Sequence, residues 1–311
     1  MGIPVVGASI PTTYGRYIFV DADNGNDGND GTSLDKAVKT IAVAYGLATT
    51  NKNDVIVLSG NADHTLSAML TVSKNRVHFV GLGPVRRYGQ GAKIVLPVTT
   101  ATTDLFAVKN IGIRNSFTNI KFINNNTVAQ NIGTVGEGGE YAVYTNCEFY
   151  NSTSLNSATD CELVLNGDSA QFYNCVFGSL ADAVVGDVVR PAVLMTSGLV
   201  TSSQSGGPSR DVLFDGCRFW KKAGGTTTSM IKIAASADLE RGMEIHDCQF
   251  IASVLGSTPA TAITSATLTN GYVMLTGDTC AMNCTKIATA TGIFSGLSAK
   301  VATATIGLQT T

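Results

Sequence analysis

The fold is decided by a six-residue stretch that occurs five times: Phe117-Thr-Asn-Ile-Lys-Phe122, Tyr144-Thr-Asn-Cys-Glu-Phe149, Phe172-Tyr-Asn-Cys-Val-Phe177, Phe214-Asp-Gly-Cys-Arg-Phe219 and Ile245-His-Asp-Cys-Gln-Phe250. The copies align without gaps and begin 27, 28, 42 and 31 residues apart in a chain of 311 residues. A repeat of this period is typical of a solenoid, in which each repeat forms one coil that contacts only its neighbours. We therefore predict a stack of parallel β-coils.

The third position of the repeat predicts a corner in each coil. Its residues are of the types that tolerate a positive φ angle, namely Asn119, Asn146, Asn174, Gly216 and Asp247. After the corner, the fourth and sixth positions share one face of a strand, because side chains alternate along it. We expect this face to point inward and to build a structural ladder from Phe122, Phe149, Phe177, Phe219 and Phe250, with Cys147, Cys175, Cys217 and Cys248 beside them.

The four ladder cysteines are interpreted as buried, reduced thiols. Stacked parallel coils lie about 4.8 Å apart, whereas a disulfide prefers a Cβ separation of about 3.8 Å, so pairing along the column would require strain. Cys280 and Met282 resemble a degenerate sixth copy of the repeat. Cys280 and Cys284 lack the neighbouring Cys or His pair that a zinc site needs.

The rest of the chain is divided by composition. An extended arm (1–16) that carries no charge before Arg16 precedes a first strand, a Gly-rich loop and a capping helix (17–53), for which Ser33 is the expected N-cap. Short β-rich runs then form the β-helix (54–250). Residues 251–311 carry three charged side chains and are expected to form C-terminal coils that either serve as an interface or simply finish the solenoid.

The overall charge excludes some partners. Lys and Arg number 21 against 23 Asp and Glu, so the net charge is −2. Nucleic-acid-binding domains usually carry a basic surface, and no apolar run approaches the roughly 18 residues that cross a bilayer. We expect neither a nucleic-acid nor a membrane partner.

Acidic residues that could cleave glycans gather near the last two repeats. The first group contains Asp211, Asp215 and Arg218, and the second contains Asp238, Glu240, Arg241, Glu244, His246 and Asp247. Both groups also fit the solvated edges of coils. The histidines (His64, His78, His246) are scattered in sequence, and a single Trp220 offers little platform for long glycans. We assign no catalytic residue.

A run rich in Asp, Asn and Gly, Asp21–Gly31, offers oxygen ligands of the kind that Ca²⁺ binds. It misses the EF-hand pattern, because the fifth and twelfth residues counted from Asp21 are Gly25 and Thr32. We interpret the run as tight turns and assign no metal and no cofactor.

Several segments resemble right-handed parallel β-helix proteins of the pectate-lyase-like superfamily. Tyr17–Asp21, with Asn29–Ser33 and Lys39–Ile41, looks like the first strand, loop and capping helix, and Asp54–Gly60 and Leu70–Gly83 are similar to the first two full coils. The resemblance implies a right-handed, single-stranded β-helix. It implies no activity, because the superfamily contains lyases, hydrolases, adhesins and virion proteins, and the galacturonase-type signatures and the lyase Arg/Lys/Asp set are missing.

Two further stretches, Leu58–Leu66 and Phe79–Arg87, are similar to β-helix proteins encoded among the structural genes of tailed bacteriophages. This resemblance implies a non-enzymatic virion protein, a capsid decoration or cement subunit that is made in the host cytoplasm and ends on the capsid exterior. The same resemblance implies a homotrimer, because viral β-helices often have three-fold symmetry. The apolar arm and the low charge of residues 251–311 favour contact with a major capsid protein through these two segments. The alternatives are a tail-associated spike or fibre that binds or depolymerises a host surface glycan, and a pectate-lyase-like polysaccharide-cleaving enzyme.

Overall fold

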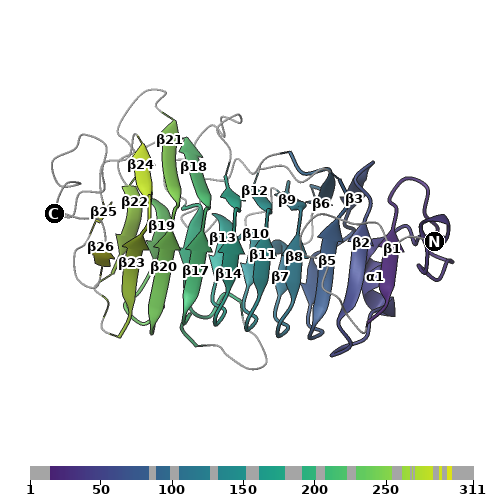
Figure 1. Ribbon diagram of the computed structural model, residues 1–311, viewed down its shortest axis with the longest axis horizontal. Coiled ribbons are helices and arrows are strands. Elements are labelled where there is room, and N and C mark those ends of the chain that lie inside the picture. The colour runs from purple at the N-terminus through teal and green to yellow at the C-terminus, as the bar shows by residue number, and fades with distance from the viewer. Residues whose placement is uncertain are drawn as a thin grey trace.

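The chain winds into a stack of coils whose strands form three parallel sheets (Figure 1). This computed structural model describes residues 15–83, 89–98, 105–126, 132–151, 161–178, 191–200, 207–222, 229–253, 261–266, 268, 270–282, 287–288 and 293–295. From β2 onward, the chain runs through sheets A, B and C in turn and returns to A one coil further on. The predicted all-β, right-handed parallel β-helix is confirmed.

The three sheets run the length of the stack. Sheet A contains β1 (Tyr17–Val20), β2 (Asp54–Leu58), β5 (Val77–Gly81), β8 (Ser116–Thr118), β11 (Val143–Thr145), β14 (Gln171–Tyr173), β17 (Val212–Asp215), β20 (Gly242–His246), β23 (Tyr272–Thr276) and β26 (Ile293–Ser295). Sheet B contains β3 (Asp63–Thr65), β6 (Ala92–Leu96), β9 (Ile120–Asn124), β12 (Glu148–Asn151), β15 (Val176–Phe177), β18 (Arg218–Lys222), β21 (Gln249–Ser253) and β24 (Cys280–Met282). Sheet C contains β4 (Leu70–Val72), β7 (Phe106–Asn110), β10 (Gly133–Glu137), β13 (Cys161–Leu165), β16 (Val193–Met195), β19 (Ser229–Ile233), β22 (Thr261–Ser265) and β25 (Ile287–Ala288).

The corner between sheets A and B is made by a single residue with positive φ. The φ angles are 56° at Asn119, 52° at Asn146, 52° at Asn174, 63° at Gly216 and 50° at Asp247. Each of these residues donates its backbone N–H to a carbonyl of the next coil, as Asn119 does to Thr145 O at 3.0 Å. This hydrogen bond offsets part of the cost of the left-handed conformation.

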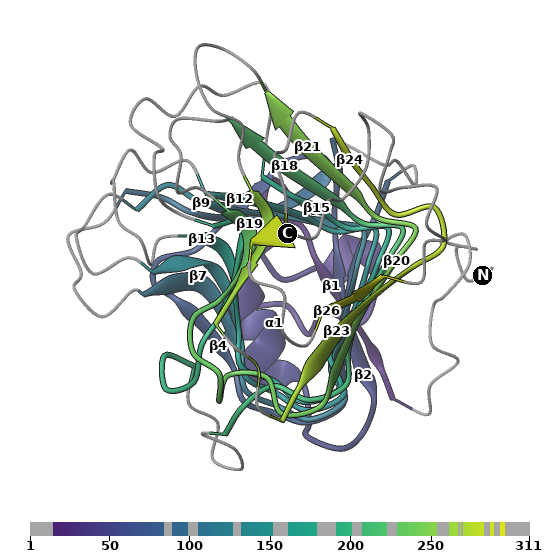
Figure 2. The ribbon, with the colours of Figure 1, turned by 90° about the vertical axis from the view of Figure 1, so that its left-hand side faces the viewer.

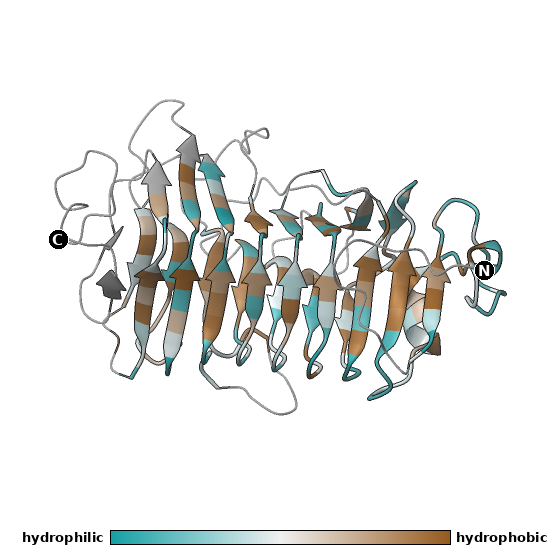
Figure 3. Ribbon diagram, viewed as in Figure 1, coloured by the Kyte–Doolittle hydropathy of each residue, from teal (hydrophilic) through white to brown (hydrophobic). Residues whose placement is uncertain are grey.

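Figure 2 shows the three sheets enclosing the interior of the coils, and two stacks of aromatic rings fill this core. One stack contains Phe79, Phe117, Tyr144, Phe172 and Phe214, with successive ring centroids 4.8–5.0 Å apart. The other contains Phe122, Phe149, Phe177, Phe219 and Phe250, with separations of 4.7–5.4 Å. The stacks meet edge to face, at 70° between Phe172 and Phe177. Apolar and polar residues alternate along many strands (Figure 3), so the apolar ones can face this core.

The four ladder thiols lie beside these rings and are buried and free. Each sulfur donates to a carbonyl of the preceding coil, as Cys217 Sγ does to Phe172 O at 3.2 Å. In the sixth coil, Thr279 takes the thiol position and donates to Ile245 O at 3.2 Å. Cys280 instead pairs with Gln249 and so occupies the fifth position of the repeat. The prediction that Cys280 and Met282 form a sixth copy is therefore wrong by one residue.

Helix α1 (Ile41–Leu47) covers one end of the stack (Figures 1 and 2) and buries Ile41 and Ala44. It begins later than predicted, because its N-cap is Thr40, whose Oγ1 accepts from Val43 N at 3.3 Å. Ser33 precedes only a short 3₁₀ turn, η1 (Leu34–Lys36), and makes no side-chain cap. Between the two, Val38 pairs with Val20 of β1, and this pairing holds the backbone extended.

The structure adds a second column of left-handed residues where each coil enters sheet A. These are Arg76, Arg114, Tyr141, Ser169 and Asp211, with φ between 49° and 59°. Strands β22 to β26, which lie beyond residue 250, continue the three sheets. Among the described residues, no helix is long and apolar enough to cross a membrane.

Candidate functional site

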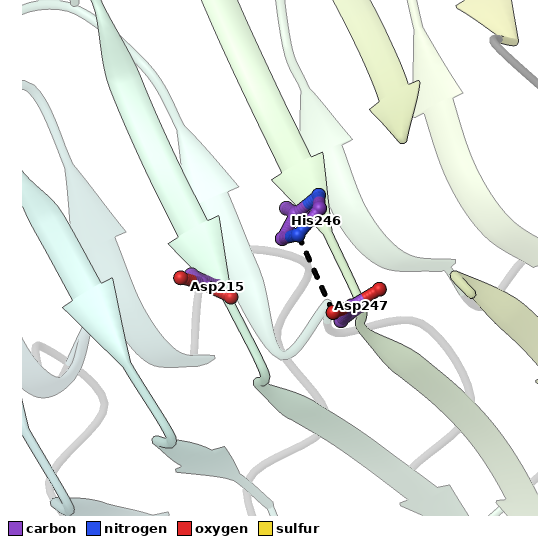
Figure 4. Close-up of side chains that lie close together, drawn as sticks. All are labelled: Asp215, His246 and Asp247. Atoms are coloured by element: carbon purple, nitrogen blue, oxygen red, sulfur yellow. Dashed lines mark ion pairs between the residues drawn. The ribbon is translucent and has the colours of Figure 1, made fainter. Parts of the chain in front are cut away.

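Two carboxylates and an imidazole come together at the edge of sheet A where its strands end (Figure 4). Asp215 is the last residue of β17, and His246 is the last residue of the adjacent β20, so the parallel register places them side by side. Asp247 follows as the corner residue. Oxygen and nitrogen atoms of the three side chains lie within 4.8 Å of one another, so we call this group the acid–histidine cluster.

The imidazole of His246 is held from both sides. Its Nε2 lies 3.3 Å from Asp247 Oδ2, and its Nδ1 lies 2.9 Å from the hydroxyl oxygen of Thr276 on β23. Thr276 in turn donates to Glu244 Oε1 at 3.1 Å. The His246 side chain is 41% exposed and that of Asp247 is 50% exposed, so a solute can reach the cluster from water.

The other predicted acidic residues lie elsewhere. Asp211 and Glu240 belong to a row of ion pairs at the entry to sheet A, where they pair with Arg241 and Arg210, respectively. Asp238 ties together two turns, because its carboxylate accepts from Ser197 N at 2.8 Å and from Ala235 N at 2.7 Å. The predicted acidic residues therefore separate into three structural groups: the acid–histidine cluster, the row of ion pairs and the Asp238 turns. Arg218 lies apart from all three, on β18 of sheet B.

The remaining histidines and the Asp-rich loop are used within the fold. His64 is buried, with Nε2 2.8 Å from Ser59 O, and burial lowers its pKa. His78 lies 2.8 Å from Ser116 Oγ, and burial lowers its pKa as well. In the loop, Asp27 accepts from the backbone of Lys39 and Thr40, so it fixes the start of α1.

A buried polar network within the core was not predicted. Glu137 of β10 is fully buried, and its carboxylate accepts from Tyr144 Oη at 2.6 Å, Asn110 Nδ2 at 2.8 Å and Gly139 N at 2.7 Å. Burial raises the pKa of Glu137 to about 7, although these three hydrogen bonds act in the opposite direction. Because solvent does not reach the carboxylate, we interpret it as structural.

The repeat alignment contained a signal for the acid–histidine cluster. Asp215 and His246 both occupy the second position of the six-residue repeat, in consecutive copies, and equal positions in consecutive coils lie next to each other. The two residues lie 31 positions apart, so their separation along the chain does not reveal the pairing. Thr276 belongs to the same row, but its coil lacks a clear copy of the repeat.

Comparison with solved structures defines the fold. The chain shares a parallel β-helix fold with several solved structures. It is 13% identical to the pectin methylesterase of Aspergillus niger (TM-score 0.52), covering 92% of this chain and 85% of that one. Pectate lyase Pel9A is 14% identical (TM-score 0.51; 91% and 80%), and a rhamnogalacturonan lyase is 14% identical (TM-score 0.53; 84% and 67%). No protein-family model and no curated protein sequence matches the chain.

These neighbours contradict our expectation that the protein is not an enzyme, because all three are named as enzymes. The expectation rested on the absence of a few sequence signatures. That criterion was too narrow, since one fold can carry different chemistries on different residues. At this level of identity the similarity establishes the fold alone.

Proposed function

We propose that the chain is a structural subunit of a tailed-bacteriophage particle, a capsid decoration or cement subunit that stands on the capsid as a rigid post. The observation that carries the proposal is the continuity of the stack, in which close-packed aromatic rings extend from Phe79 to Phe250. Side chains packed at interior density resist compression and bending. The similarity of Leu58–Leu66 and Phe79–Arg87 to phage-encoded β-helices supports this setting.

The proposed contacts lie at the two low-charge ends of the chain. We infer that the subunit is a homotrimer on the capsid exterior, assembled in the host cytoplasm, and that it contacts a major capsid protein through residues 1–16 and 251–311. A stable interface buries on the order of 1,000 Å² or more, and segments with few charges lose less solvation free energy on burial than charged segments do. Residues 1–14 lie outside the described residues.

Particle localisation tests the proposal. Phage particles would be purified from the bacterial host that carries the gene and treated with antibodies against the chain. The antibodies should label the capsid shell in electron micrographs. Absence of the chain from purified particles would overturn the proposal.

Deletion of residues 1–15 tests the proposed attachment, because strand pairing begins at Tyr17 and the coils should remain folded. The truncated chain should lose particle binding and keep the far-ultraviolet circular dichroism spectrum of the full chain. A variant with a Gly-Ser segment of equal length in place of residues 1–15 controls for chain length. Unchanged particle binding, together with a monodisperse monomer in light scattering, would argue against both the attachment and the trimer.

A second candidate function is action on a surface polysaccharide by a tail-associated β-helix. The observation that favours it is the exposed acid–histidine cluster, on a fold shared with enzymes that are named for pectin, pectate and rhamnogalacturonan. Purified chain would be screened against uronate polymers and bacterial surface polysaccharides, and turnover should be lost in Asp215→Asn and kept in Asp211→Asn. If the antibodies described above label phage tails rather than capsids, this second candidate function becomes the favoured one.

A further inference from the structure

The acid–histidine cluster has the geometry of a metal site. The 3.3 Å between His246 Nε2 and Asp247 Oδ2 matches the edge of a tetrahedron with metal–ligand bonds of about 2.0 Å. Asp215 completes the set, with all donor atoms within 4.8 Å, and rotation of its side chain can close the remaining gap.

Hydrogen bonds fix which nitrogen of His246 is free to bind. A hydroxyl has one proton to donate, and Thr276 donates it to Glu244 Oε1. Its oxygen therefore accepts the proton on His246 Nδ1, and in the neutral imidazole the lone pair is left on Nε2. Nε2 and Asp247 Oδ2 then face each other as two acceptors, an arrangement that a cation between them would stabilise. Metal-binding histidines are usually held by their other nitrogen in this way.

The next coil leaves room for the carboxylate. Gly277 has a φ of 62°, and a Cβ atom there would lie 2.0 Å from Asp247 Oδ1 and 2.9 Å from His246 Cε1. The following amide, Asp278 N, donates to Asp247 Oδ1 at 2.7 Å. One oxygen of Asp247 is thereby anchored, and the other is directed at the imidazole. The equivalent positions in the coil before Asp215 are Tyr173 and Asn174, so that coil adds neither a carboxylate nor an imidazole to the cluster.

We propose that Asp215, His246 and Asp247 bind one divalent transition-metal cation, with Zn²⁺ as the probe, and that this ion ties β17 to β20. One nitrogen with two carboxylate oxygens suits Zn²⁺, whereas Ca²⁺ and Mg²⁺ prefer oxygen ligands alone. Three protein ligands leave a fourth position open to water. The site does not rest on the proposed particle role. It shares Asp215 with the second candidate function, but metal binding is measured without a turnover assay, so the two proposals can fail separately.

The test is calorimetric titration of the chelator-treated full chain with ZnCl₂. We expect one Zn²⁺ per chain and at least tenfold weaker binding in His246→Gln, Asp247→Asn and Asp215→Asn. Asp211→Asn, an acidic residue beside the same strand but outside the cluster, is the matched control and should bind as the wild type does. A tenfold excess of Ca²⁺ should not displace Zn²⁺. Absence of saturable binding, or wild-type affinity in His246→Gln, would overturn the site.

Two further measurements separate binding from folding. All variants should unfold at comparable temperatures without metal, and Zn²⁺ should raise the midpoint of the wild type and of Asp211→Asn only. Thr276 is a positioning residue, so Thr276→Val should weaken binding about tenfold and Thr276→Ser should restore it. With Co²⁺ as a spectroscopic probe, a thiolate charge-transfer band would place the ion on a cysteine and so contradict the proposal.

Discussion

Replacing Phe172 by alanine tests whether the aromatic stacks hold the coils together. Phe172 is fully buried and packs against rings of both stacks. It stacks on Tyr144 and Phe214, with ring centroids 5.0 and 4.8 Å away. It also meets Phe149 and Phe177 nearly edge to face, at 6.3 and 5.7 Å.

The size of the effect follows from this packing. Truncation of a buried Phe to Ala costs about 3 to 5 kcal/mol of unfolding free energy. An aromatic pair contributes about 0.5 to 1.5 kcal/mol beyond its buried area, and the energies of neighbouring pairs are not additive. We therefore expect the upper end of the range, about 5 kcal/mol. Phe172→Leu keeps most of the volume and removes only the ring geometry, so it should cost about 1 to 2 kcal/mol.

Urea unfolding measures both variants, followed by circular dichroism and by the fluorescence of Trp220. Coincident curves from the two probes are required before a single free energy is used. Lys93→Ala, which removes a partly exposed ion pair with Asp63, is the control and should cost less than about 1 kcal/mol. A loss of stability in Phe172→Ala no larger than that of the control would refute the claim that the stacks stabilise the coils.

The remaining predictions concern thiols, a buried acid and a helix cap. The four ladder thiols should react with Ellman's reagent only on unfolding, and rapid labelling of the native chain would show that the column is not buried. The pKa of Glu137 is raised from 4.5 to about 7, so the folded state holds the proton more tightly than the unfolded state does. The free energy of unfolding should therefore fall as the pH rises from about 4.5 through 7. This part of the slope should disappear in Glu137→Gln, and identical pH profiles would contradict the assignment. Thr40→Ala should cost about 1 kcal/mol in urea unfolding, whereas Thr40→Ser should keep the cap; equal stabilities would argue against capping.

The sequence was sufficient to predict the coils because their pattern is local and repeated. Asn119, Asn146 and Asn174 marked the corner, and a Phe followed three residues later. The second left-handed column was not predictable, since Arg76 and Tyr141 do not favour that conformation. It is imposed by the hydrogen bonds to the next coil, such as Arg76 N to Ile113 O at 2.9 Å.

The start of α1 and the acid–histidine cluster depend on contacts between distant residues. Ser33 is a residue type that favours the N-cap position. The helix nevertheless begins only after Thr40, because Val38 pairs with Val20 and keeps the backbone extended before it. The cluster joins Asp215 to His246 across a coil boundary, which only the aligned register shows. Ordinary propensity rules describe each residue with its chain neighbours and so miss both features.

The register of the stack makes the length of the molecule a modular quantity. Tyr144 stacks on Phe117 and Phe172 in equivalent ways, with rings 4.8 and 5.0 Å away. Excision of residues 144–171 would remove one whole turn, bring Phe172 onto Phe117, and shorten the rod by about 4.8 Å. Loss of a single residue would instead exchange the inward and outward faces of the strand that follows. Deletion or duplication of a whole turn therefore disturbs the packing of this fold less than loss of a single residue does. Such changes can give β-helices of different length from one repeat.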